Sequence, residues 1–252
     1  MVVDSLALRY AHYAIASYQA FSRHKAAETI PSSVRLQVSL PLPKTLVVEW
    51  IKPEYQEMVE TQYKAAIVRA IEGIQGSIPH QDLAIQIDCR LTSPDFEMRT
   101  AGSEIDDTLL LASCAARLAR YIAADVELGL HIASSSPGTT QSIVDMAKAV
   151  RRQCSKPVAW MHLSLPPDTT NEQSLLPLED LAPDRFPTKT ELVLGLVLPR
   201  DEEGSRRRLF KAAERLGTTD FGISAACNLV DLTQDDFKDV LRILRVLSMP
   251  HE

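Results

Sequence analysis

Residues 83–89 read Leu-Ala-Ile-Gln-Ile-Asp-Cys, so leucine and isoleucine alternate with small or polar side chains. Successive side chains of a strand point to opposite faces of its sheet, so this period of two predicts a strand with one apolar and one polar face. The polar face ends on Asp88, beside the carboxyl end of the predicted strand. The stretch therefore predicts a sheet with one polar face. It also predicts that the carboxylate of Asp88 lies near the carboxyl end of its strand.

Six segments of this kind occur along the chain, and helical patterns lie between most of them. The predicted strands are Val34–Leu40, Leu83–Cys89, Val126–Ile132, Val158–Leu165, Leu192–Leu198 and Phe221–Cys227. The predicted helices are Leu6–Arg23, Tyr55–Ile74, Asp106–Ala123, Gln141–Arg152, Ser205–Leu216 and Gln234–Val246. Pro166–Pro187 holds five prolines and predicts a long loop with at most a short helix near Leu178–Leu181. Strand–helix alternation predicts an α/β fold with a parallel sheet, in a single domain over residues 1–252.

The polar face argues for a barrel rather than a doubly wound sheet, whose strands would be apolar on both faces. In a TIM barrel one face packs on helices and the other faces a narrow lumen, with active sites at the carboxyl ends of the strands. The predicted polar positions gather at those ends. Six strands fall short of eight, and the first 30 residues have a helical pattern. We therefore expect a TIM-barrel-like (β/α) parallel barrel that is incomplete.

Composition excludes several classes of protein. The 252 residues include 33 acidic and 27 basic side chains, and the net charge of −6 argues against binding to nucleic acid or an anionic membrane. No apolar run approaches the roughly 18 residues of a membrane span. Four scattered cysteines (Cys89, Cys114, Cys154 and Cys227) predict neither a disulfide framework nor a structural zinc site. The first residues lack the pattern of a signal peptide, so we expect a soluble, cytoplasmic protein.

Several segments carry a family resemblance, in order along the chain. Residues 10–21 (YAHYAIASYQAF) and 34–41 (VRLQVSLP) resemble the opening helix and third strand of the barrel superfamily that contains cobalamin-independent methionine synthase and uroporphyrinogen decarboxylase. Residues 78–88, 127–131 and 221–227 resemble its fourth, fifth and eighth strands, and the chain is most similar to the methionine-synthase-like proteins common in fungi. The resemblance implies a (β/α)₈ fold whose first two βα units are absent here.

The resemblance also bears on metal binding. Zinc in methionine synthase is held by His, Cys, Glu and Cys, with His-x-Cys on strand five and a Cys after strand eight. The matching segment here is His131-Ile132-Ala133, and Ala226 stands before Cys227 where an acid is common. A zinc site needs three or four protein ligands, so these departures from the family pattern imply no metal and no other cofactor.

The polar face supplies the candidate site residues. We expect Asp88 to be a general acid or base, and His131 and His162 to donate protons or stabilise an oxyanion. The candidate substrate-binding residues are Gln37, Gln86, Arg90, Ser164 and Asn228. The structural alternatives are an Asp88 carboxylate paired with Arg90 or with a backbone amide, and histidines that are hydrogen-bonded parts of the core.

Four other features are given structural roles. Glu127 lies near the start of its strand, Trp160 is expected to fill the core, and Cys227 is expected to be a core residue. The run Arg206–Arg208 is expected to form a solvated helix face with ion pairs. None of these is expected to take part in chemistry.

We therefore expect a metal-independent enzyme acting on a small organic substrate by isomerisation, cyclisation, elimination or decarboxylation. The chain contains no GxGxxG and no phosphate-binding loop. One alternative is a methyltransferase with an altered zinc site, which one bound zinc per chain would favour. Another is an inactive barrel remnant that binds a partner through its open edge.

A homodimer is expected because the outermost strands of an open sheet each have an unpaired side. The helix Leu6–Arg23 is amphipathic, with Leu6, Tyr10, Tyr13, Ala14 and Phe21 near one face. We expect this helix to shield one edge or the open mouth of the sheet.

Overall fold

The computed structural model describes residues 2–91, 107–134, 140–166, 172–186, 188–226, 229 and 232–249. These residues form an α/β fold around a six-stranded sheet with the strand order β1-β2-β3-β4-β5-β6, in which every neighbouring pair is parallel. The strands are β1 (Leu36–Pro41), β2 (Leu83–Leu91), β3 (Glu127–Ser134), β4 (Trp160–Ser164), β5 (Glu191–Val197) and β6 (Gly222–Ala225). All six predicted strands are confirmed.

The sheet is open. In the described parts of the chain β1 and β6 stand at opposite ends of the strand order and do not pair. The sheet is thus incomplete, as expected from six strands, and its polar face does not line a closed lumen. What the structure shows is a parallel α/β sheet with helices, without closure into a barrel.

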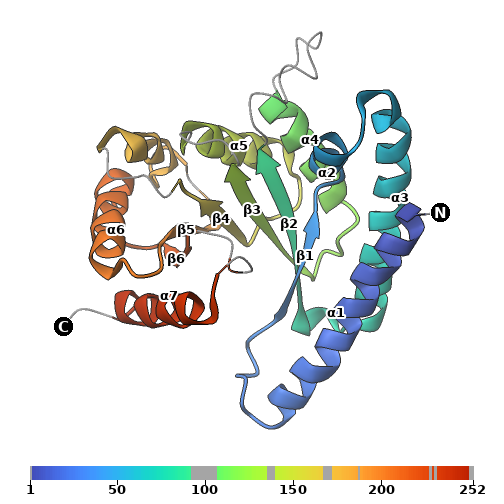
Figure 1. Ribbon diagram of the computed structural model, residues 1–252, viewed down its shortest axis with the longest axis horizontal. Coiled ribbons are helices and arrows are strands. Elements are labelled where there is room, and N and C mark those ends of the chain that lie inside the picture. The colour runs from blue at the N-terminus through green and yellow to red at the C-terminus, as the bar shows by residue number, and fades with distance from the viewer. Residues whose placement is uncertain are drawn as a thin grey trace.

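The helices form an arc around the outer face of the sheet, from α1 and α3 past α4 and α5 to α6 and α7 (Figure 1). The α-helices are α1 (Val2–Ala26), α2 (Pro43–Trp50), α3 (Pro53–Ser77), α4 (Asp107–Ala119), α5 (Thr140–Gln153), α6 (Glu202–Leu216) and α7 (Gln234–Leu247). Two 3₁₀ helices are η1 (His80–Asp82) and η2 (Glu172–Leu181). Among the described helices none has the length and apolar character needed to cross a bilayer.

The core lies between the outer face of the sheet and these helices. The leucine-rich side of the strands is almost fully buried, as at Ile85 and Ile87 on β2 and Leu130 on β3. These side chains belong to one cluster with apolar residues of α3 and α5, such as Ile71 and Val144. Burying each such side chain contributes about 1.5–3 kcal/mol, so the outer face stabilises the sheet and leaves the polar face free for other roles.

Three helical segments differ from the prediction: α2 and η1 were not expected, and η2 is longer than the short helix expected near Leu178–Leu181. The segment α2 has only eight residues and is rich in β-branched side chains, so its sequence shows no clear helical period. The segment η2 lies in the middle of the long loop expected over Pro166–Pro187, and it tolerates Pro177 inside it. It forms because Leu175, Leu178 and Leu181 lie at intervals of three and are buried in the core.

The first helix packs along α3 rather than across the open side of the sheet, and it also contacts β1. The Tyr10 and Tyr63 hydroxyls lie 3.2 Å apart. Asp82 accepts hydrogen bonds from Tyr18 (2.8 Å) and from Lys25 (2.7 Å). The predicted apolar face is wrong at Tyr13, which is 61% exposed, while the side chain of Leu6 lies outside the described residues.

Candidate functional site

The polar face of the sheet brings four of the predicted residues together. The register of the parallel strands places Asp88 of β2 beside His131 of β3, and His131 beside His162 of β4. Ser164 follows His162 on the same face of β4, because alternate residues of a strand share a face. The cluster lies toward the carboxyl ends of the strands, as the sequence predicts.

A carboxylate, an imidazole and a hydroxyl form a row across three neighbouring strands. Asp88 Oδ1 lies 3.4 Å from His131 Nδ1, and His131 Nε2 lies 2.8 Å from Ser164 Oγ. The side chains of Asp88 and His131 are 37% and 28% exposed, so the row is reachable from solvent. With its proton on Nδ1 facing Asp88, His131 can accept the Ser164 proton at Nε2.

The second histidine is stacked on the first. The rings of His131 and His162 lie 4.6 Å apart at 23°, and His162 Nε2 hydrogen-bonds the hydroxyl of Ser224 on β6. Burial and then the neighbouring His131 lower the pKa of His162 to about 4, while Asp88 partly opposes the shift. His162 is therefore neutral near pH 7, and its ring N–H can donate a hydrogen bond to a developing oxyanion without carrying a charge.

Gln86 holds the acidic end of the cluster in place. Its side-chain amide donates to Asp88 Oδ1 (2.9 Å) and lies 3.2 Å from Ser39 Oγ, and its carbonyl oxygen accepts from the Trp160 indole (3.2 Å). Gln86 itself is 6% exposed, while its three partners are partly open to solvent. We assign Gln86 a positioning role, since it orients the carboxylate that in turn faces His131.

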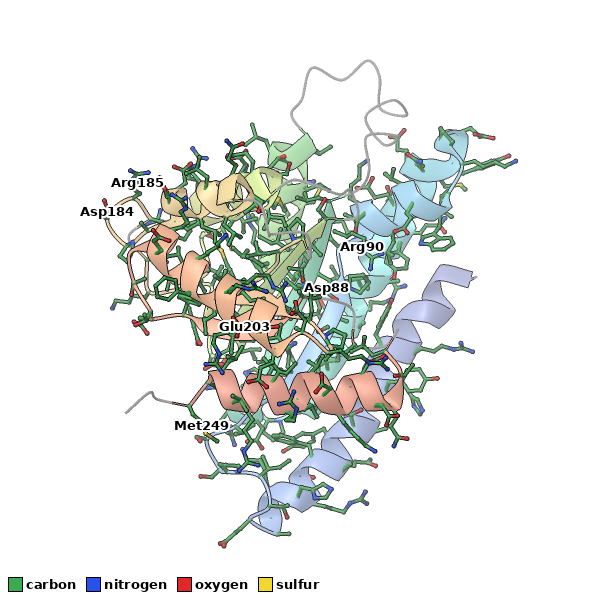
Figure 2. The ribbon with its side chains drawn as sticks, turned by 60° about the vertical axis from the view of Figure 1, so that its left-hand side comes forward. Asp88, Arg90, Asp184, Arg185, Glu203 and Met249 are labelled. Atoms are coloured by element: carbon green, nitrogen blue, oxygen red, sulfur yellow. The ribbon has the colours of Figure 1, made fainter. Side chains whose placement is uncertain are left out.

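The other predicted substrate-binding residues are more scattered. Gln37 on β1 donates to Ser39 (3.3 Å), and Arg90 is exposed on β2 beyond Asp88, as Figure 2 shows. Asp88 and Arg90 form no ion pair with each other, because the carboxylate is turned toward Gln86 and His131. The ion pair between Asp88 and Arg90, which was one structural alternative, is therefore wrong. Asn228 and Cys227 lie outside the described residues.

A cavity of about 510 Å³ opens on the same face, nearer the amino ends of the strands. Its walls include Gln37, Gln86 and His162, so it adjoins the histidine cluster. They also include Arg35, Trp160, Glu191 and Ser224, none of which was predicted as a site residue. Trp160 is thus a half-buried wall residue, and its expected role as a core filler is wrong.

The missed residues had a signal in the sequence. Trp160 has the same parity along its strand as His162 and Ser164, and Ser224 occupies a polar position of its own strand. Parity alone thus places both on the polar face. The reach of the indole across β3 toward Gln86 was not evident, because it depends on Gly129, whose Cβ would overlap the Trp160 ring.

The described residues do not fit the zinc site that the family resemblance suggests. They contain no group of three or more His, Cys, Asp or Glu side chains arranged to hold a metal ion. The resemblance would assign one zinc ligand to His131, but Ala133 supplies no second one and Cys227 lies outside the described residues. No step of the chemistry is therefore assigned to a metal.

No protein-family model and no curated protein sequence matches this chain.

Proposed function

We propose that the protein is a metal-independent enzyme that moves protons on a small organic substrate at the Asp88–His131–Ser164 row. The observation that carries the proposal is the contact between these three side chains on adjacent strands, open to solvent on one side. A carboxylate behind an imidazole fixes its tautomer and stabilises the imidazolium that forms when it takes a proton. His131 is therefore the general base, and Asp88 orients it.

Neutral His162 supplies a hydrogen-bond donor beside the base. Its ring is stacked on His131, so a substrate that contacts both side chains would meet the base and an N–H that stabilises an oxyanion. General acid–base catalysis of this kind contributes about 10²–10⁴-fold in rate. It suits isomerisation, cyclisation and elimination, in which His131 removes a proton and, once protonated, can return it. It also suits decarboxylation, in which a proton is delivered to the carbon that loses CO₂.

The wider architecture supports the same proposal. Six successive parallel βα units with a polar face match what a TIM-barrel-like fold without its first two units would retain. The polar cluster extends from the middle of the strands toward their carboxyl ends, the side on which barrel enzymes carry their chemistry. We propose membership of the methionine synthase and uroporphyrinogen decarboxylase superfamily on the residues quoted above, and a small-molecule substrate with it.

Proton removal from carbon can be tested before the natural substrate is known. The protein is incubated in D₂O with a panel of small ketones, β-keto acids and β-hydroxy acids, and proton NMR follows deuterium incorporation, decarboxylation and elimination. We expect turnover of at least one compound class, reduced about 100-fold or more in His131→Gln. The proposal is wrong if folded wild-type protein turns over no compound, or if His131→Gln retains the wild-type rate.

A second candidate function follows from the short contact between His131 Nε2 and Ser164 Oγ. Ser164 Oγ would attack an ester carbonyl while its proton passes to His131. The alcohol would leave with that proton, and water would then hydrolyse the acyl-serine. A fluorophosphonate probe followed by peptide mass spectrometry tests this, since acyl transfer requires an adduct at Ser164 that Ser164→Ala and His131→Gln both abolish. Unlabelled Ser164 in wild-type protein would exclude this candidate and leave the acid–base proposal standing.

A further inference from the structure

The cavity at the amino ends of β3, β4 and β5 has a composition that the acid–base cluster does not explain. We infer that it binds an organic cation, with an alkylammonium group held between the Trp160 indole and the Glu191 carboxylate. The inference does not depend on the proposed function, because none of the groups that bind the cation belongs to the Asp88–His131–Ser164 row.

The indole of Trp160 forms a fixed platform. In the sheet register Trp160 stands between Gly129 of β3 and Glu191 of β5. A Cβ at residue 129 would overlap the indole, so glycine at this position lets the ring lie against β3. The indole nitrogen donates to Gln86 Oε1 (3.2 Å), which fixes the rotation of the ring. The indole is thus fixed against β3, and Trp160 lines the cavity.

Glu191 places a negative charge beside this platform. It is exposed at the first position of β5, and its Oε1 lies 3.2 Å from where a Cβ of Gly222 would be, so it leans over the neighbouring strand β6. No described cation pairs with the Glu191 carboxylate. The glycines on either side of the Trp160–Glu191 pair therefore keep both side chains accessible on the polar face.

The charges around the cavity sum to one excess negative charge. Arg35 is already committed, since its Nε lies 3.2 Å from Glu127 Oε1 and its Nη1 donates to the His80 carbonyl oxygen (2.8 Å). His162 carries no charge near pH 7, because its pKa is lowered to about 4. Of the charged groups that line the cavity, Glu191 alone lacks a described counter-ion.

An aromatic face beside a single carboxylate favours an organic cation over a metal ion. Metal ions require several oxygen or nitrogen ligands, and the described residues offer no such group here. A quaternary or tertiary ammonium is weakly hydrated, and it gains from both the indole face and the nearby charge. A cavity of about 510 Å³ also has room for the rest of a small organic molecule.

Trp160 can report binding directly. Replacing the other tryptophan, the exposed Trp50, by phenylalanine leaves Trp160 as the single indole of the chain. The full-length Trp50→Phe protein is titrated with choline at pH 7.5 while tryptophan emission is recorded. Sodium chloride at matched ionic strength controls for charge screening. The neutral analogue 3,3-dimethylbutan-1-ol has the same shape as choline and controls for burial of apolar surface.

Two further variants separate the charge from the fold. Glu191→Gln removes the carboxylate at an exposed position, so the fold is retained, which circular dichroism verifies. Glu203→Gln makes the same change of charge at an exposed position of α6 (labelled in Figure 2) that does not line the cavity. Comparing the two variants distinguishes local recognition from the effect of net charge.

We expect a saturable change in emission with a dissociation constant in the range of about 1–10 mM for choline. Glu191→Gln should weaken binding about fivefold or more, and Glu203→Gln less than about twofold. Three results would overturn the inference: no saturable change up to about 100 mM choline, equal binding of the neutral analogue, or unchanged binding in Glu191→Gln.

Discussion

Asp88 distinguishes a catalytic from a structural interpretation of the polar face. Its carboxylate accepts from Gln86 and faces His131, and it is partly open to solvent. Asp88→Asn keeps the shape of the side chain but removes the charge that would stabilise a protonated His131. We expect proton-transfer activity in the deuterium assay to fall about 100-fold or more, while the free energy of unfolding changes by less than about 1 kcal/mol.

The control for this prediction is Asp184→Asn, which removes an exposed carboxylate far from the cluster (Figure 2). Activity and stability should both remain near wild type in this variant. Full activity in Asp88→Asn together with a marked loss of stability would show that Asp88 is a structural partner of Gln86 and His131.

His162 predicts a particular dependence of stability on pH. Its pKa is about 4 in the folded protein and about 6.5 when exposed, so the unfolded chain binds more protons between these values. The stabilisation is therefore complete above about pH 6.5 and is lost as the pH falls toward 4. We expect up to about 3 kcal/mol to be lost over this window in urea unfolding.

The matched variant is His162→Asn, which cannot take up a proton over the same window. Its stability should change less than that of the wild type between pH 6.5 and 4. Carboxylates with lowered pKa values, such as Asp82 and Asp180, lose their contribution only as the pH falls through a lower range. Identical slopes for wild type and His162→Asn between pH 6.5 and 4 would contradict the prediction.

At the residue scale the period of two accounts for most of what the sequence could predict. It placed Asp88, His131, His162 and Ser164 on one face, and the parallel register then brought them into contact. The sequence could not reveal which partner each side chain would choose. Asp88 faces a histidine on the next strand rather than Arg90 on its own, because neighbouring strands lie only about 4.8 Å apart.

Helix α6 shows how an element can bury a charge that its sequence suggests is solvated. Arg206 pairs with Glu202 at the surface, as expected for the run Arg206–Arg208. Arg208 is instead 5% exposed, and its Nε donates to the Leu196 carbonyl oxygen of β5 (2.7 Å). Its Nη1 and Nη2 reach Asp201 and Ser205, so one guanidinium ties the helix start to the strand.

We expect Arg208→Met to reduce the free energy of unfolding by about 2–3 kcal/mol, because it leaves the buried Leu196 carbonyl without its donor. Arg207→Met, at an exposed position of the same run, should change it by less than about 0.5 kcal/mol. Urea unfolding of the two variants measures the difference. Equal effects would mean that Arg208 contributes no more than a surface charge.

At the scale of elements, the sequence predicted the strands and the longer helices, and it missed the short helical segments. The strands and the longer helices repeat an apolar pattern over enough residues to be recognised. The eight residues of α2 do not, and η2 contains a proline that suggests a loop. Both owe their structure to packing against the core rather than to local preference, as the buried Val47 and Leu178 show.

At the scale of the whole molecule, strand count and strand order were predictable. The position of α1 relative to the open side of the sheet was not. The sequence contains six strand patterns and no seventh, which correctly implied an unclosed sheet. The position of α1 depends on contacts such as Tyr10 with Tyr63 and Lys25 with Asp82. The residues of each pair lie more than 50 positions apart in the chain, and no local sequence pattern predicts such contacts.

The open sheet predicts self-association. The outer edges of β1 and β6 have no described strand partner, and an unpaired edge offers backbone donors and acceptors to another chain. Because α1 packs along α3, it leaves these edges without a hydrogen-bonded cover. The simplest arrangement that satisfies both edges without open-ended growth is a two-fold dimer.

Sedimentation at micromolar concentration should then show a species of about twice the 27.9 kDa chain mass. Its formation should be favoured by added salt, because both copies carry a net charge of −6. Hydrogen exchange gives the second measurement, since the edge amides should become protected as the dimer forms and remain open in dilute protein. A chain that stays monomeric at high concentration with both edges protected would show instead that it covers its own edges.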